Sequence, residues 1–165
     1  MTIKIYKNFL DEKDYKNLQA IMLNNYFPWY ITPIIDDIGI ESDHYKNSQF
    51  THNFYDDYLQ RSNYFNLVTC FLNKLKPKAL IRIKANLLTR TNKKIIHGMH
   101  TDTKFKCNTA VYYVNSNNGE TIFENGKKVQ SKENTLVVFP SQLKHSGTTH
   151  TCNSAYRVVI NINYF

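Results

Sequence analysis

The sequence predicts an α+β domain that is mainly β. Two segments near the amino end carry apolar residues at helical spacing. After residue 79 the chain changes to short segments in which apolar and polar residues alternate, as strands require. Aromatic residues are plentiful, with 12 Tyr and 10 Phe, and their rings pack well on pleated sheets. Helices followed by strands are typical of a domain in which the helices cover one sheet.

The first expected helix spans residues 10–25, where Asp11 is a suitable N-cap. Its helically spaced positions are Leu10, Tyr15, Leu18, Ile21 and Met22. The second expected helix spans residues 64–76 and is ended by Pro77. Residues 27–60 between them are aromatic, polar and without clear periodicity, so they are expected to form a long loop, a kind of segment that often has a function.

The expected strands begin with residues 79–90, where Arg82, Lys84 and Asn86 alternate with apolar residues. Further strands are expected at residues 107–115, in a hairpin over residues 121–130, at residues 134–139 and at residues 156–165. Several short strands at regular spacing predict a sandwich or a barrel. We therefore expect a single domain over residues 1–165, with a helical and loop part at 1–78 and a strand-rich core at 79–165.

Composition limits the class of protein. Apolar residues make up 42% of the chain, which excludes a disordered or fibrous protein. The net charge of +8 favours anionic partners, nucleic acid among them, although a solvated basic face is the simpler explanation. The three cysteines form no disulfide framework or zinc pattern. Without a signal peptide or a membrane-length apolar run, the expected location is cytoplasmic, with no membrane association. The sequence carries no signal for an oligomeric state.

A possible metal site begins with His100 and Asp102. On a strand, residues two apart point to the same side, so an imidazole and a carboxylate would converge there. His145, soon after the strand at residues 134–139, is the natural third ligand. Two histidines and one carboxylate form the facial triad that leaves open positions on iron(II). Taken singly, these residues could equally be a surface ion pair and a turn histidine.

The remaining histidines are weaker candidates. His97 does not have strand spacing from His100, and His150 lies in a threonine-rich loop, so neither is expected to bind the metal. His44 and His52 lie in the expected loop at residues 27–60. There, contact with a substrate is possible, but an ordinary surface role is expected more often.

Arg157 opens an apolar strand, and a buried arginine requires an anion. Alternation places Arg157, Val159, Asn161 and Asn163 on one face, which resembles the wall of a pocket. A planar guanidinium binds carboxylates through two hydrogen bonds, so an arginine near a facial triad suggests a dicarboxylate that also chelates the metal. The alternative is an arginine that simply reaches solvent. Tyr113 could donate its hydroxyl to the same carboxylate, or could be an ordinary core tyrosine.

Together these motifs resemble the iron(II)- and 2-oxoglutarate-dependent dioxygenases, specifically the prolyl 4-hydroxylase-like branch. The resemblance covers residues 80–165. It rests on the His100-Thr101-Asp102 motif, on the strand at residues 109–115, and on Gly119-Glu120-Thr121 with Phe123. The order continues with Phe139-Pro140-Ser141 and His145-Ser146-Gly147, and ends with Arg157 followed by Asn161, Asn163, Tyr164 and Phe165.

The resemblance implies a double-stranded β-helix, or jelly roll, with the metal ligands at its open end. It implies that His100, Asp102 and His145 hold iron(II), and that Arg157 and Tyr113 hold the far carboxylate of 2-oxoglutarate. Ascorbate is a possible reductant. Collagen-type members carry lysine at the position of Arg157. The strand before the triad often carries a tyrosine that faces the co-substrate; here Asn86 is the best polar substitute. Asn163, on the strand of Arg157, is a further candidate for co-substrate binding.

The substrate is not readable from these residues. Family analogy favours a prolyl or other peptidyl residue, with succinate and carbon dioxide as co-products. Oxidation of a nucleic acid or of a small metabolite by the same mechanism is an alternative, as is a cupin-like metal-binding module without turnover. Residues 27–60 are the expected lid or substrate rim. Their aromatic residues, which could equally pack as core, are Trp29, Tyr30, Phe50, Phe54 and Tyr55.

Overall fold

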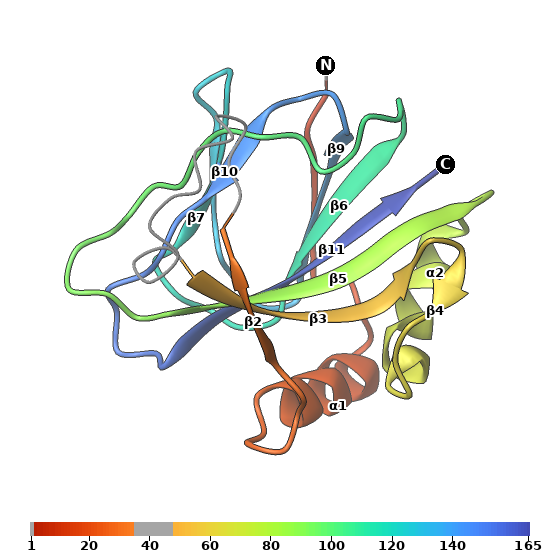
Figure 1. Ribbon diagram of the computed structural model, residues 1–165, viewed down its shortest axis with the longest axis horizontal. Coiled ribbons are helices and arrows are strands. Elements are labelled where there is room, and N and C mark those ends of the chain that lie inside the picture. Colours follow the sequence, from red (N-terminus) through yellow and green to blue (C-terminus); the bar gives the residue numbers. More distant parts are fainter. Residues whose placement is uncertain (1, 35–47) are drawn as a thin grey trace.

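Two antiparallel sheets form the protein, and both helices lie on one side of the larger sheet (Figure 1). The computed structural model describes residues 2–34 and 48–165. The larger sheet has eight strands in the order β1-β9-β6-β11-β5-β3-β2, with β4 paired to β3, and the smaller sheet has the order β10-β7-β8. The strands are β1 (Lys4–Lys7), β2 (Tyr30–Pro33), β3 (Ser48–Asp56), β4 (Leu59–Gln60), β5 (Leu80–Thr89), β6 (Asn108–Tyr113), β7 (Glu120–Phe123), β8 (Lys128–Gln130), β9 (Thr135–Pro140), β10 (His145–Gly147) and β11 (Tyr156–Tyr164).

The two helices confirm the predicted helical segments. Helix α1 (Glu12–Met22) begins after Asp11 and buries Tyr15, Leu18 and Met22. Helix α2 (Thr69–Leu75) continues a 3-10 turn, η1 (Phe65–Val68), and ends at Lys76 in the left-handed conformation. Pro77 accounts for this end because a proline disfavours the helical conformation in the residue before it.

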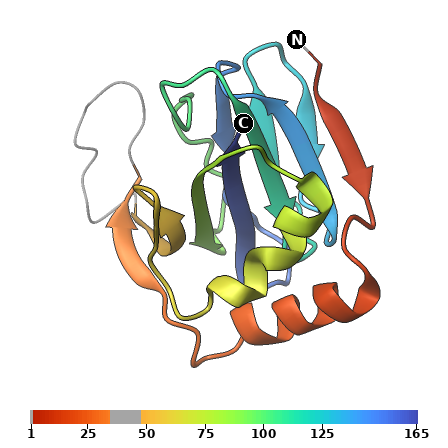
Figure 2. The same ribbon diagram turned by 90° about the vertical axis from the view of Figure 1, so that its right-hand side faces the viewer.

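Two hydrophobic clusters lie on opposite faces of the larger sheet. The first joins the helices to the sheet and contains the fully buried Ile83, Ala85, Ile160 and Ile162. Figure 2 shows the helices lying across this face. The second cluster contains residues of both sheets, with Tyr113, Phe123 and Phe139 as its largest members. The structure therefore confirms the prediction of a two-sheet β fold with helices packed on one of its sheets.

Strands β5 and β11 pair in the middle of the larger sheet, with Val159 opposite Asn86. Alternate positions, which include Ile83, Ala85, Ile160 and Ile162, pack toward the helices, and the positions between them face the space between the sheets. The alternation predicted for both strands is thereby confirmed. It brings polar side chains of two adjacent strands into one cavity. No helix in the described part of the chain is long and apolar enough to cross a bilayer.

The expectation of a long loop over residues 27–60 is wrong for much of that segment. Strand β3 pairs with both β2 and β5 inside the larger sheet. A register shift between Asn53 and Tyr55 interrupts its alternation, which is why the pattern of a strand is hidden in the sequence. Phe54 is a fully buried core residue rather than part of a substrate rim.

Other residues of the expected loop also have structural roles or lie outside the described residues. His52 is buried, and its ring nitrogens contact the Pro28 carbonyl and the Ser62 hydroxyl, each at 2.7 Å. It is thus part of the framework and not a surface or substrate residue. His44 lies outside the described residues.

Candidate active site

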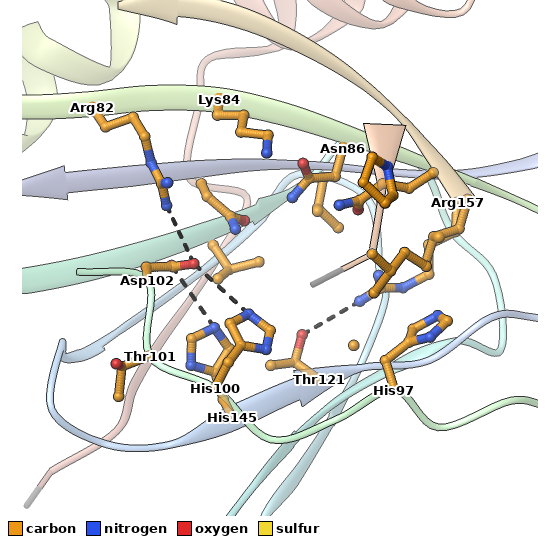
Figure 3. A pocket seen from close by; sticks show the side chains of 18 residues that line it. Arg82, Lys84, Asn86, His97, His100, Thr101, Asp102, Thr121, His145 and Arg157 are labelled. Carbon is orange, nitrogen blue, oxygen red and sulfur yellow. Dashed lines mark hydrogen bonds and ion pairs between the residues drawn. The ribbon is translucent and has the colours of Figure 1, made fainter. Parts of the chain in front are cut away.

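A cavity of about 310 Å³ lies against the inner faces of β5 and β11. Figure 3 shows His100, Asp102 and His145 together on one side of this cavity and Arg157 on the opposite side. Arg82, Lys84 and Asn86 follow one another along β5 between these two sides. The cavity therefore has a side with metal-ligand chemistry and a side with a guanidinium group.

The predicted triad comes together in space. One ligand atom from each of His100, Asp102 and His145 lies within 4.8 Å of the others. The Nε2 atoms of His100 and His145 are 3.9 and 3.8 Å from the carboxylate oxygens of Asp102. These side chains are therefore close enough to share one metal ion.

The local structure of the His-x-Asp motif differs from the strand that the sequence predicts. His100 forms only an isolated bridge with His145, through reciprocal backbone hydrogen bonds of 2.9 and 3.0 Å. Asp102 lies in irregular structure beyond that bridge. The bridge explains the convergence better than strand alternation does, because it joins the two histidines directly.

Asp102 is buried, with its side chain only 5% exposed. Burial raises the pKa of this carboxyl, but the charges of His145, Arg82 and His100 and the nearby Asn163 amide outweigh burial and lower the pKa overall. Arg82 makes the direct contact, with its Nη2 atom 3.3 Å from Oδ1. The other oxygen, Oδ2, is buried without a hydrogen bond among the described residues.

The surroundings of His145 favour the neutral form of its imidazole. Burial lowers the pKa of this side chain and His100 acts in the same direction, although Asp102 opposes them. A neutral histidine has a free lone pair for a metal, so burial favours the ligand form. The His145 ring lies edge-on to Phe139, with centroids 4.8 Å apart, which restricts its orientation.

Arg157 is buried, at 3% exposure, and lines the cavity. Its Nε donates to the Ser131 hydroxyl at 2.8 Å, and its Nη2 donates to the Glu120 carbonyl at 3.3 Å and to the Thr121 hydroxyl at 3.4 Å. None of these acceptors carries a charge. Among the described residues, Arg157 has no carboxylate partner, and its Nη1 has no acceptor.

Tyr113 lies behind the cavity rather than on its wall. Its hydroxyl donates to Thr121 Oγ1 at 2.9 Å, and its ring faces the Arg157 guanidinium at 5.9 Å. Thr121, which does line the cavity, stands between the Tyr113 hydroxyl and Arg157. Sequence reasoning missed Thr121, because a four-residue hairpin strand does not reveal which of its residues contacts the arginine.

The two asparagines of the sequence analysis occupy different places. Asn86 lines the cavity, and its Oδ1 has no hydrogen-bond partner among the described residues. Asn163 is fully buried outside the cavity wall and donates to the Thr109 hydroxyl at 3.0 Å. Its amide also helps to lower the pKa of Asp102. Asn163 therefore lies where it can orient the carboxylate rather than contact a ligand.

The other histidines lie outside the triad, as expected. His97 lines the cavity but is not part of the three-residue cluster, and His150 is fully buried next to Cys152. Arg82 and Lys84 were predicted to share a strand face with Asn86. Their place in the cavity, however, was not foreseen, because the sequence does not show which face of β5 meets the triad.

Comparison of the sequence with protein-family models gives no match, and comparison with curated proteins gives none either. Comparison of the fold does find similar structures. A prolyl hydroxylase from Trichoplax adhaerens, solved with a hypoxia inducible factor peptide fragment, has a TM-score of 0.67 and 16% identity, covering 99% of this chain and 83% of that one. A 2OG-Fe(II) oxygenase family protein from Burkholderia pseudomallei has a TM-score of 0.67 and 13% identity, covering 98% and 84%.

A third similar structure is a prolyl-4-hydroxylase from Pseudomonas putida, with a TM-score of 0.60 and 12% identity, covering 98% of this chain and 91% of that one. The three likenesses extend over nearly the whole chain, including the helical part that the sequence resemblance did not cover. The chain therefore has the jelly-roll fold of the prolyl hydroxylase-like 2-oxoglutarate and iron(II) oxygenases.

Proposed function

We propose that this protein is an iron(II)- and 2-oxoglutarate-dependent oxygenase that hydroxylates a C–H bond, with residues 1–165 acting as one catalytic domain. One observation carries the proposal. The buried Arg157 has no carboxylate partner among the described residues, and it faces the same cavity as the His100, Asp102 and His145 cluster. A buried cation is costly without an anion, so the cavity is suited to a ligand that supplies one.

The triad fits iron(II). Two imidazoles and one carboxylate are the ligand set of non-haem iron oxygenases and leave positions open for a co-substrate. The buried, unbonded Oδ2 of Asp102 gives a metal a ready ligand atom, and burial of His145 favours the neutral imidazole that binds a metal. When bound, the iron supplies oxygen activation, coupled to conversion of 2-oxoglutarate into succinate and carbon dioxide.

The protein's own residues bind and orient the ligands. Arg157 binds the far carboxylate of 2-oxoglutarate, and Thr121 holds the guanidinium in place. Tyr113 supports Thr121 from behind through its hydroxyl. Asn86 offers a polar group on the cavity wall for the co-substrate, and Asn163 orients the Asp102 carboxylate.

The substrate class proposed first is a prolyl or other peptidyl residue. The fold supports it, because two of the similar structures are described as prolyl hydroxylases, and one of them was solved with a peptide. A nucleic acid or a small metabolite remains the alternative within the same chemistry. A cupin-like metal-binding module without turnover is the alternative outside it, and the buried Arg157 disfavours that alternative.

The test is succinate formation from 2-oxoglutarate by protein loaded with iron(II) under air, with ascorbate added to keep the iron reduced. We expect slow succinate release even without substrate, and its loss in Asp102→Ala. The exposed Glu12→Ala, in the first turn of α1, is the matched control and should behave as wild type. Absence of succinate from iron-loaded, folded wild-type protein, with and without pooled peptides, would favour the binding module.

A further inference from the structure

The described residues that line the cavity carry more positive charge than its proposed ligands balance. Among the described residues, its charged lining consists of Arg82, Lys84 and Arg157 against the single carboxylate of Asp102. A bound iron(II) adds two positive charges, and 2-oxoglutarate, with two carboxylates, removes two. With the histidines counted as neutral, an excess of two positive charges remains on the described part of the cavity wall. Such an excess favours a further anion.

Lys84 is the cation left for that anion. Arg157 lies on the opposite side of the cavity, where its guanidinium donates a hydrogen bond to Ser131. Arg82 forms an ion pair with Asp102. Lys84 lies between them on β5, is partly buried, and makes no hydrogen bond or ion pair within the described part of the chain. Asp102 and Asp56 act on it only through longer-range attraction. Figure 3 shows its ammonium group directed toward the cavity.

Partial burial of a charged ammonium group has an unfavourable free energy. Burial and the neighbouring Arg82 both lower the pKa of Lys84, so the fold disfavours its charged form. An apolar residue at this position would remove that cost, and the opposite face of the same strand consists of such residues. The charge is therefore better explained by a ligand than by the stability of the fold.

We propose that the substrate carries a carboxylate and that the ammonium of Lys84 binds this carboxylate beside the triad. This proposal rests on the proposed function. The substrate would be an acidic residue of a peptide or a free carboxylic acid. Lys84 is two residues from Arg82, which contacts the metal ligand Asp102, so a carboxylate bound there lies close to the reacting position. A cavity of about 310 Å³ is at the small end of ligand sites, which suits one small acid group next to 2-oxoglutarate.

The experiment compares binding of acids with that of their amides. Protein loaded with redox-inactive Zn²⁺ and 2-oxoglutarate is titrated with peptide pools that have Asp or Glu fixed at one position, and with matched Asn or Gln pools. Free aspartate and glutamate, with their amides, form a second arm that separates a peptide from a free acid. We expect wild type to bind the acids about tenfold to a hundredfold more tightly than the amides, and Lys84→Met to lose that preference.

Two controls separate this proposal from the proposed function. Lys84→Met should still bind 2-oxoglutarate, whereas Arg157→Met should lose the affinity for 2-oxoglutarate. The exposed Lys128→Met should keep the acid preference. An acid preference that survives in Lys84→Met, no acid preference in either arm, or tighter binding of an oligonucleotide than of any carboxylate would overturn the proposal. If the wild-type protein did not bind 2-oxoglutarate, that result would instead refute the proposed function.

Discussion

Gly119 controls the position of Arg157, and its replacement by alanine provides a sharp test of that arginine's role. A Cβ atom at Gly119 would lie 2.5 Å from Cδ and 2.9 Å from Nε of Arg157, and 2.9 Å from Asn117 Oδ1. The φ angle of Gly119 is outside the range that requires glycine, so space rather than backbone conformation requires it here. The Gly119→Ala change should therefore push the arginine side chain away from Ser131.

The expected cost has two parts. Overpacking of a buried site destabilises a protein by about 1–3 kcal/mol. Displacement of the guanidinium also weakens hydrogen bonds to a charged group, which are worth about 1.5–3 kcal/mol each. A loss of that size in ligand binding corresponds to roughly a tenfold to hundredfold weaker affinity for 2-oxoglutarate. Metal affinity should remain close to wild type, because the triad is on the other side of the cavity.

Calorimetric titration with 2-oxoglutarate and with the metal, together with urea unfolding, checks these expectations. Gly126→Ala is the matched control. Gly126 has φ +82° in an exposed turn with nothing near its missing Cβ, so alanine should cost stability without affecting 2-oxoglutarate. Wild-type affinity for 2-oxoglutarate in Gly119→Ala would refute the role given to the position of Arg157.

Three further predictions concern the framework around the site. Asn134→Ala should lower the free energy of unfolding by about 2–4 kcal/mol, measured in urea, because the Asn134 amide makes two hydrogen bonds of 2.9 Å to the backbone of Leu10; a loss below that range would contradict it. Thr121→Val should destabilise the protein by about 1–3 kcal/mol by leaving the buried Tyr113 hydroxyl unpaired. The double variant with Tyr113→Phe should recover much of that loss, and additive losses would contradict the pairing. Burial lowers the pKa of His52, although the Pro28 carbonyl opposes it. The unfolded chain therefore binds a proton at this histidine more readily than the folded protein does. The free energy of unfolding should have its full value above pH 6.5 and should decrease as the pH falls below it. His52→Gln should weaken this pH dependence, and equal urea midpoints from pH 8 to 5 in wild type would argue against it.

The parts of the site that follow sheet alternation could be predicted from the sequence. Arg157 and Asn161 share a face of β11, and Lys84 and Asn86 share a face of β5, because a period of two is maintained over a long paired strand. The segment of β3 could not be predicted in this way. The register shift after Asn53 breaks its period, and its aromatic residues are consistent with either a loop or a core strand.

The contacts between segments were also beyond sequence reasoning. The three residues of the predicted triad lie close together, but the link between His100 and His145 is an isolated bridge that depends on tertiary structure. Tyr113 was expected to reach the co-substrate, and the structure instead directs its hydroxyl to Thr121. That outcome depends on which strand of the small sheet lies opposite β6, and a single sequence contains no signal for it.

The most direct test of the central claim is the affinity for 2-oxoglutarate, measured by titration with and without the metal, in wild type and Arg157→Met. If the cavity holds a metal on one side and a dicarboxylate clamp on the other, removal of either should weaken binding strongly. Arg157→Met should still bind one metal ion through His100, Asp102 and His145. Equal affinity for 2-oxoglutarate in the presence and absence of the metal, or in wild type and Arg157→Met, would contradict the account.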